Sequence, residues 1–125
     1  MANPNIVNVT SILGTTTYLT PANTTANTLL SNAASSGLVY KINQIVCANV
    51  NGTSAVNATV AINNLAAGAG TNFPVISTIS VPASASVIAV DKTTAIYLME
   101  NTSIVVTSGT ASGITYTISY ESIAS

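Results

Sequence analysis

The chain has 125 residues, of which 48% are hydrophobic and only 4% are charged, and its formal net charge is -1. Globular proteins usually carry about 25% charged residues, so the polar surface here must consist mainly of serine, threonine and asparagine. Lys41 and Lys92, with no arginine beside them, could neutralise only a couple of phosphates, whereas nucleic-acid binding usually takes about 6–10 such contacts. We therefore exclude nucleic acid as a partner.

The N-terminal sequence MANPNIVNVTSIL has no lysine or arginine before its apolar residues, and Pro4 comes early. It lacks the pattern of a secretory signal. No stretch approaches about 18 uninterrupted apolar residues, so we expect no transmembrane helix and no membrane partner. Cys47 is the one cysteine and cannot form an internal disulfide. These features are typical of a protein that is made in, and stays in, a reducing cytoplasm.

Alternation of apolar and polar residues with a period of two recurs along the chain, whereas helical spacing fits nowhere over a useful length. The clearest example is GITYTISYESI at 113–123, where isoleucine and tyrosine alternate with threonine and serine. The longest alternating stretch is 38–50, where a bend near Gln44 could let one strand serve two neighbours. We expect strands near residues 5–13, 26–32, 38–50, 55–63, 75–81, 84–91, 95–100, 103–108 and 113–123.

Turn signals such as NG at 51–52 and SGTASG at 108–113 separate these strands at regular spacing, and 64–74 has the character of a surface loop. The pattern predicts an all-β chain, a single antiparallel β-sandwich of about eight or nine strands with a jelly-roll or immunoglobulin-like course. The sandwich domain is expected to span residues 14–125. The predicted core consists of Val56, Val60, Ile62, Ile79, Val81, Ile96, Leu98, Ile104, Val106, Ile114, Tyr116 and Ile118.

Residues 1–13 are expected to form an N-terminal arm or edge strand, with Gly14 as a hinge. Pro4 cannot donate a ladder hydrogen bond, so pairing should begin after it. An ordinary first strand of its own domain is the alternative. If the segment is an arm, deleting residues 2–13 should leave the domain folded and abolish assembly. The residues expected at an assembly interface, where they would fill a neighbour's groove or complete its sheet, are Ile6, Val7, Val9, Ile12 and Leu13.

The chain has no histidine, which removes the commonest general base and the commonest metal ligand. Cys47 lies in an alternating strand and is expected to be a small buried residue. Asp91 and Glu100 fall in predicted turns, and Glu121 falls on the polar face of the last strand. We therefore expect no catalytic residue, no metal ligand and no cofactor, and interpret the protein as non-enzymatic.

Four stretches that cover most of the chain together resemble a group of small β-sandwich virion proteins of tailed bacteriophages, especially those that infect marine cyanobacteria. These stretches are PNIVNVTSILG at 4–14, LLSNAASSGLVYKINQIVCANVNGTSAVNATVAI at 29–62, ISVPASASVIAVDKTTAIYLMENTSIVV at 79–106 and YTISYESI at 116–123.

The resemblance implies a virion location and a capsid decoration or cement protein that binds the phage head in many copies. The implied partner is the major capsid protein or another virion protein. A tail, neck or fibre component, such as a receptor- or glycan-binding module, is the alternative. Because a shell repeats its docking sites and linked weak contacts reinforce one another, we also expect self-association, as a homotrimer or another small ring.

Overall fold

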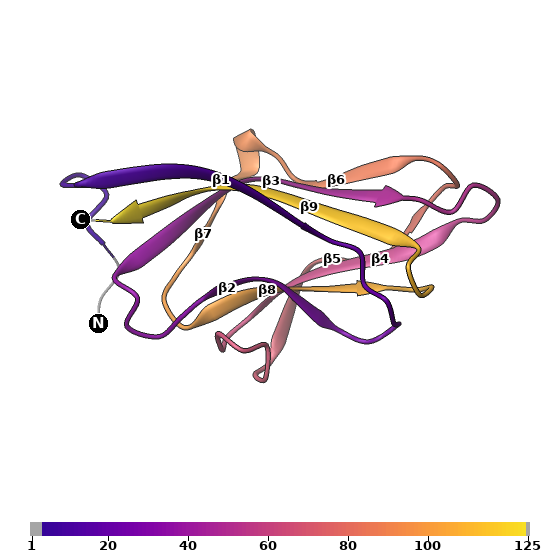
Figure 1. The fold of residues 1–125 in the computed structure, drawn as a ribbon, viewed down its shortest axis with the longest axis horizontal. Helices are drawn as coiled ribbons and strands as arrows, with labels where there is room; N and C mark the ends of the chain where they lie inside the picture. Colours follow the sequence, from indigo (N-terminus) through magenta and orange to yellow (C-terminus); the bar gives the residue numbers. More distant parts are fainter. Residues whose placement is uncertain (1–3, 125) are drawn as a thin grey trace.

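The computed structural model describes residues 4–124, and within them the chain forms nine β-strands and one short 3-10 helix. The strands form two antiparallel sheets that pack face to face, which confirms the predicted all-β sandwich (Figure 1). Sheet A has the order β1 (Ser11–Leu19), β9 (Ile114–Ala124), β3 (Leu38–Asn49) and β6 (Ser86–Val90), with β7 (Ile96–Leu98) also paired to β3. Sheet B has the order β2 (Asn27–Asn32), β8 (Thr102–Ser108), β4 (Val56–Asn63) and β5 (Asn72–Val81).

The strand order is that of a jelly roll rather than of an immunoglobulin domain. Strands β6 and β7 lie on the same side of β3 and act as one interrupted strand. With that pair counted once, each sheet has four strands, and the chain passes repeatedly from one sheet to the other in the double Greek-key course of a jelly roll. The interruption is the 3-10 helix Lys92–Thr94, whose first turn is capped by the side chain of Asp91.

The long strand β3 does serve two neighbours, as the sequence suggested. Its residues 40–42 pair with β7 and its residues 45–48 pair with β6. In the pairing with β9, Ile42 is opposite Tyr120 and Gln44 is opposite Ser119, so Asn43 is an extra residue and forms a β-bulge. The bulge bends β3 between the segments that meet β6 and β7.

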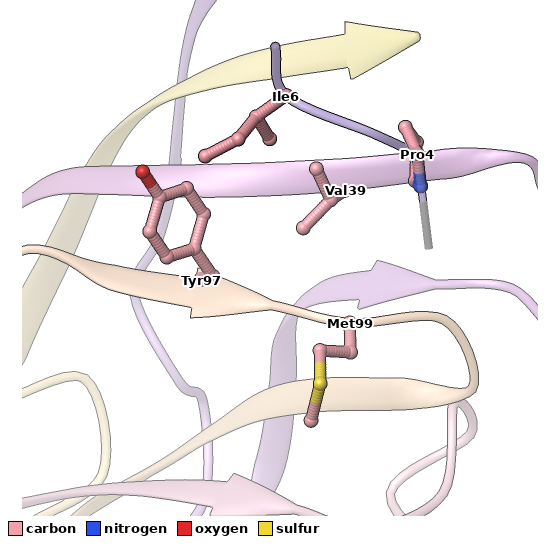
Figure 2. Close-up of a pocket in the computed structure, with 5 residues that line it drawn as sticks. All are labelled: Pro4, Ile6, Val39, Tyr97 and Met99. Atoms are coloured by element: carbon pink, nitrogen blue, oxygen red, sulfur yellow. The ribbon is translucent and has the colours of Figure 1, made fainter. Parts of the chain in front are cut away.

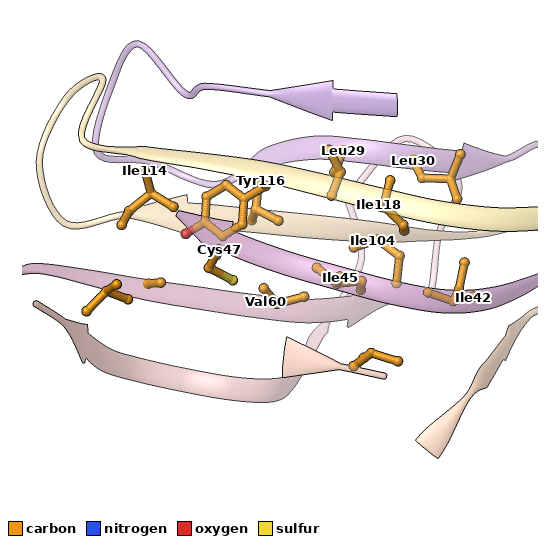
Figure 3. Packing of buried hydrophobic residues seen from close by; sticks show 14 of the residues in the cluster. Leu29, Leu30, Ile42, Ile45, Cys47, Val60, Ile104, Ile114, Tyr116 and Ile118 are labelled. Atoms are coloured by element: carbon orange, nitrogen blue, oxygen red, sulfur yellow. The ribbon is translucent and has the colours of Figure 1, made fainter. Parts of the chain in front are cut away.

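The core between the sheets is apolar, and its largest fully buried side chain is Tyr116 (Figure 3). Of the predicted core residues, Ile62 and Ile96 are only partly buried and pack against the core cluster. Ile79 is 40% exposed, and its assignment to the core was wrong. It lies in the edge strand β5 and has a paired strand on one side only. The other nine are buried: Val56, Val60, Val81, Leu98, Ile104, Val106, Ile114, Tyr116 and Ile118.

The first strand lies later in the chain than the sequence predicted. Residues 5–8 form a turn, in which the side chain of Asn5 accepts a 2.9 Å hydrogen bond from the Val7 amide and its carbonyl accepts one from the Asn8 amide. Gly14 is not a hinge, because it lies inside β1 and pairs with Glu121. The expected strand near 5–13 is therefore wrong in position, and the boundary expected after residue 13 falls within β1.

Three buried asparagines close the ends of the sandwich. Asn32, Asn49 and Asn63 are the last residues of β2, β3 and β4, and all three side chains are buried. The Asn32 side-chain amide, for example, donates to the carbonyls of Leu38 (2.9 Å) and Leu98 (3.0 Å). Buried polar groups are stable only when paired, so these side chains hold the turns that follow their strands.

Asn63 is the most completely bonded of the three. Its Nδ2 donates to the Gly68 carbonyl at 3.2 Å and to Asn72 Oδ1 at 2.6 Å, and its Oδ1 accepts from the amides of Leu65 and Gly70, each at 3.0 Å. One side chain therefore ties the connection between β4 and β5 to the end of sheet B.

Candidate assembly surface

The segment before β1 lies over the outer face of sheet A. Ile12 pairs with Ile123, and Ile123 pairs with Val39, so the three side chains form one row across β1, β9 and β3. Side chains alternate between the two faces along β3, and Tyr40 and Ile42 pack inward against the core. Val39, and with it the whole row, therefore faces away from the core. Val39 and Ile123 are nevertheless buried. The preceding segment reaches this region, since the Thr10 amide donates to the Ala124 carbonyl at 2.8 Å.

A shallow apolar hollow of about 280 Å³ opens where this segment meets β3 and β7. Figure 2 shows the Ile6 side chain between Tyr97 on one side and Val39 on the other. The lining side chains are all apolar or aromatic, and they come from the N-terminal segment, from β3, from β7 and from the residue that follows β7. They are Pro4, Ile6, Val39, Tyr97 and Met99.

We call this hollow and the neighbouring Ile12 the apolar corner. Ile6, Ile12, Tyr97 and Met99 are each about half exposed, although all four are large hydrophobic residues. Single exposed hydrophobic residues are common on proteins, but a group around one hollow indicates a contact surface. The corner has the chemistry to bind an apolar side chain or surface.

Charged and polar groups border the corner along the same face. Lys41 pairs with Tyr97 on one side and with Glu121 on the other, so these three lie in one row beside the apolar row. Asn43, at the bulge, donates from Nδ2 to Glu121 Oε1 at 3.0 Å. The border limits the apolar surface and would orient whatever covers it.

The structure brings only part of the predicted interface together. Ile6 and Ile12 both belong to the apolar corner, whereas Leu13 lies on the opposite side of β1 and is 63% exposed. Val7 is 91% exposed, and Val9 is partly buried. Whether any of them contacts another chain stays a prediction.

Sequence reasoning missed Tyr97 and Met99. The signal was present, because Ile96 and Leu98 were assigned to the core and their neighbours on the same alternating stretch must then face outward. What the sequence could not show is that the N-terminal segment crosses the outer face of β3 and meets these two side chains.

The titratable side chains do not form a chemical centre in residues 4–124. Cys47 is a free, buried thiol, as predicted, and burial raises its pKa to about 12. Burial also raises the pKa of Tyr116, whose hydroxyl donates to the Thr107 carbonyl. The pKa of Asp91 is lowered, chiefly by hydrogen bonds from the side chain and amide of Thr93. In this described part of the chain, no three histidine, cysteine or acidic residues gather to hold a metal ion.

Searches for similarity add no family to this picture. Comparisons with protein-family models, curated proteins and solved structures found no match to the chain. No helix within residues 4–124 is long and apolar enough to cross a membrane. The fold, the apolar corner and the sequence therefore carry the inference about function.

Proposed function

We propose that this protein is a non-enzymatic virion structural protein, a capsid decoration or cement protein that binds the phage head in many copies and stabilises it. The observation that carries this proposal is the apolar corner, a group of half-exposed hydrophobic side chains on a chain in which only 4% of the residues are charged. Its partner is the major capsid protein or another virion protein. The resemblance of the sequence to small phage virion proteins supports the same role.

The polar surface next to the corner is suited to being covered. On the outer face of sheet A, the hydroxyls of Thr16 and Ser119 are 3.0 Å apart, and those of Thr20 and Thr115 are 2.8 Å apart. Hydroxyls that already bond to each other lose little when water is removed, whereas buried charges impose a large desolvation cost. A surface of this kind can pack against a shell on several sides.

A tail, neck or fibre component is the second candidate, and the fold and two exposed rings favour it. Jelly rolls occur in lectin domains as well as in viral capsids, so the fold alone does not separate the two roles. Tyr18 is 74% exposed and Tyr97 is about half exposed, and such rings could stack against a sugar. A glycan-binding module on a fibre would use them in this way.

Quantitative mass spectrometry of purified particles of the phage that encodes this chain tests the proposal. A decoration protein should be present at a copy number comparable with that of the major capsid protein. A copy number close to that of known tail proteins would favour the second candidate instead. Absence of the chain from the particles would contradict both.

A binding assay with empty capsids tests the apolar corner itself. The double substitution Ile6→Ser and Met99→Ser should weaken binding, because it removes two exposed apolar contacts at the hollow. Ile88→Ser is the matched control, since Ile88 is 55% exposed on β6, outside the corner. Equal binding by both variants would exclude the corner as the docking surface.

A further inference from the structure

The free edge of β1 is long, regular and uncharged. β1 has nine residues, SILGTTTYL, and all nine pair with β9 without a register shift. The strand contains no proline and no charged residue. Within residues 4–124 no strand pairs with its other side, so a row of backbone amides and carbonyls is left there without a strand partner. Natural proteins usually protect such an edge, because it can pair with another chain.

The other sheet edges within residues 4–124 carry protective features. β5 has a proline, Pro74, two register shifts against β4, and Thr78 with a φ of 48°. β2 has six residues and a register shift between Thr28 and Leu30. β6 and β7 are short and are separated by a turn that contains Asp91 and Lys92. β1 is therefore the edge best suited to pair with a further strand.

The edge of β1 is complementary to itself. If two copies meet antiparallel on a two-fold axis through Thr15, Ile12 of one copy lies opposite Tyr18 of the other. Ile12 is 52% exposed and Tyr18 is 74% exposed, so each gains an apolar neighbour. The same register sets Gly14 of one copy opposite Thr16 of the other and diagonal to the second copy's Tyr18 ring. No atom lies within 4 Å of the position that a Cβ atom on Gly14 would take, so there is open space beside Gly14. The pairing brings no two charges together.

We infer that two copies of this protein associate through β1, which pairs antiparallel with β1 of the second copy and joins the two A sheets into one. Such a contact is closed, because each copy uses the one regular free edge that residues 4–124 offer and the same residues serve both sides. Main-chain hydrogen bonds supply the affinity, and the two Ile12–Tyr18 pairs fix the register. The two-fold pair is an alternative to the trimer or small ring expected from the sequence, and it does not depend on a virion role.

Charge-swap variants test the pairing and its register by sedimentation equilibrium. The wild type should be a dimer. Ile12→Lys with Tyr18→Lys places like charges opposite each other and removes both apolar pairs, so it should weaken the dimer about tenfold or more. Ile12→Lys with Tyr18→Glu places opposite charges in contact across the axis and should restore the dimer. Both positions are at least half exposed, and circular dichroism should show folded protein in each case.

Ile88→Lys is the matched control, because Ile88 is an exposed residue of the same sheet on the far strand β6. It should leave the dimer unchanged. A wild type that is monomeric at every concentration, or that forms a trimer, would overturn the inference. So would a Lys/Lys variant that dimerises as strongly as the wild type.

Disulfide trapping gives a second test that does not depend on weakened binding. Opposed residues of antiparallel strands have Cα atoms about 4.5–5.5 Å apart, within the range that a disulfide spans. Thr15→Cys should therefore cross-link two copies under mild oxidation, whereas Ser77→Cys on the edge strand β5 should not. The native Cys47 is buried and will not compete. Equal cross-linking of the two variants would contradict pairing through β1.

Discussion

Strands β1 and β5 are both edge strands, but the free edge of β1 is regular and that of β5 is irregular. β1 is regular over its whole length and is paired residue by residue with β9. β5 is interrupted by Pro74 and by two register shifts, and it has Thr78 in a left-handed conformation. Proline and bulges are the devices that keep an edge from pairing with another chain. One edge is thus closed to further strands, and the other is left open.

The exposed apolar residues of this protein are not scattered evenly along the chain. Several of them, among them Ile6, Ile12, Leu13 and Tyr18, lie in the first 19 residues, on or just before β1. They contribute little to the core, which is formed by other strands. Their exposure is understandable if the open edge and the adjacent apolar corner meet other chains, as both proposals require.

The largest expected effect concerns the interior that supports both edges. Tyr116 is fully buried and lies opposite Leu19 of β1 and Cys47 of β3. Tyr116→Ala should lower the free energy of unfolding by about 3–5 kcal/mol, because it leaves a cavity and removes the hydrogen bond to the Thr107 carbonyl. Tyr18→Ala on the exposed face of β1 should change it by less than about 0.5 kcal/mol. Urea denaturation measures both, and similar losses would mean that β1 is not an exterior element.

The second prediction concerns the local stability of β5 relative to that of β1. Asn63→Ala removes four hydrogen bonds of the connection that leads into β5 and leaves the Leu65 and Gly70 amides without their partner. We expect a loss of about 2–3 kcal/mol, with faster hydrogen exchange in β5 than in β1.

Asn64→Ala is the matched control, because Asn64 is exposed and its side chain accepts a single bond, from the Thr71 amide at 2.8 Å. Asn64→Ala should lower the free energy of unfolding clearly less than Asn63→Ala does. Equal costs for the two alanine variants would show that burial of Asn63 contributes nothing.

The third prediction concerns alkaline pH and two buried groups of sheet A, the sheet that contains β1. Cys47 and Tyr116 both belong to sheet A, and burial raises the pKa of each, that of Cys47 from 9.0 to about 12. The folded state therefore holds these protons more tightly than the unfolded state. Below pH 9 the thiol of Cys47 is protonated in both states, so it adds no pH dependence to the free energy of unfolding. Between pH 9 and about 12 that free energy should fall as pH rises, by up to about 1.4 kcal/mol per pH unit.

Cys47→Ala should make this alkaline slope shallower, although the smaller side chain lowers stability at neutral pH. Thermal denaturation from pH 7 upward measures the slope in both proteins. An unchanged slope would mean that the thiol of Cys47 ionises freely in the folded protein.

The smallest effect tests the irregularity of β5 directly. Thr78 has a φ of 48°, a conformation that costs a β-branched residue energy and that glycine adopts freely. Thr78→Gly should raise the free energy of unfolding by about 0.5–1 kcal/mol, the relief of strain less the entropy that glycine loses. Ser77→Gly, at the adjacent residue of the same register shift, where φ is not positive, should lower it. A loss of stability in Thr78→Gly would argue against strain at this point.

Much of the fold could be predicted from sequence because most strands bury one face. Strands β3, β4, β8 and β9 have a strong apolar pattern, and their bounds were predicted to within a few residues. The position of β1 could not be predicted in this way. Its first six residues, SILGTT, are exposed on both faces, so they show no alternation of apolar and polar side chains.

The candidate site was harder to predict than the fold. Ile6 and Ile12 were identified because they are apolar residues near the N-terminus, but their neighbours Val39, Tyr97 and Met99 are distant in sequence. Only the chain path over sheet A brings them together. Buried asparagines such as Asn63 were missed for another reason, since an asparagine at the end of a strand has the appearance of an ordinary turn residue.

Hydrogen exchange of the β1 amides, measured at several protein concentrations, tests the open edge most directly. Amides of β1 that point away from β9 should exchange slowly in concentrated protein and become faster on dilution, because the second copy protects them. Amides of β5 that point away from β4 should exchange at a rate that does not depend on concentration. If the outward amides of β1 exchange as fast in concentrated as in dilute protein, β1 does not pair with another copy.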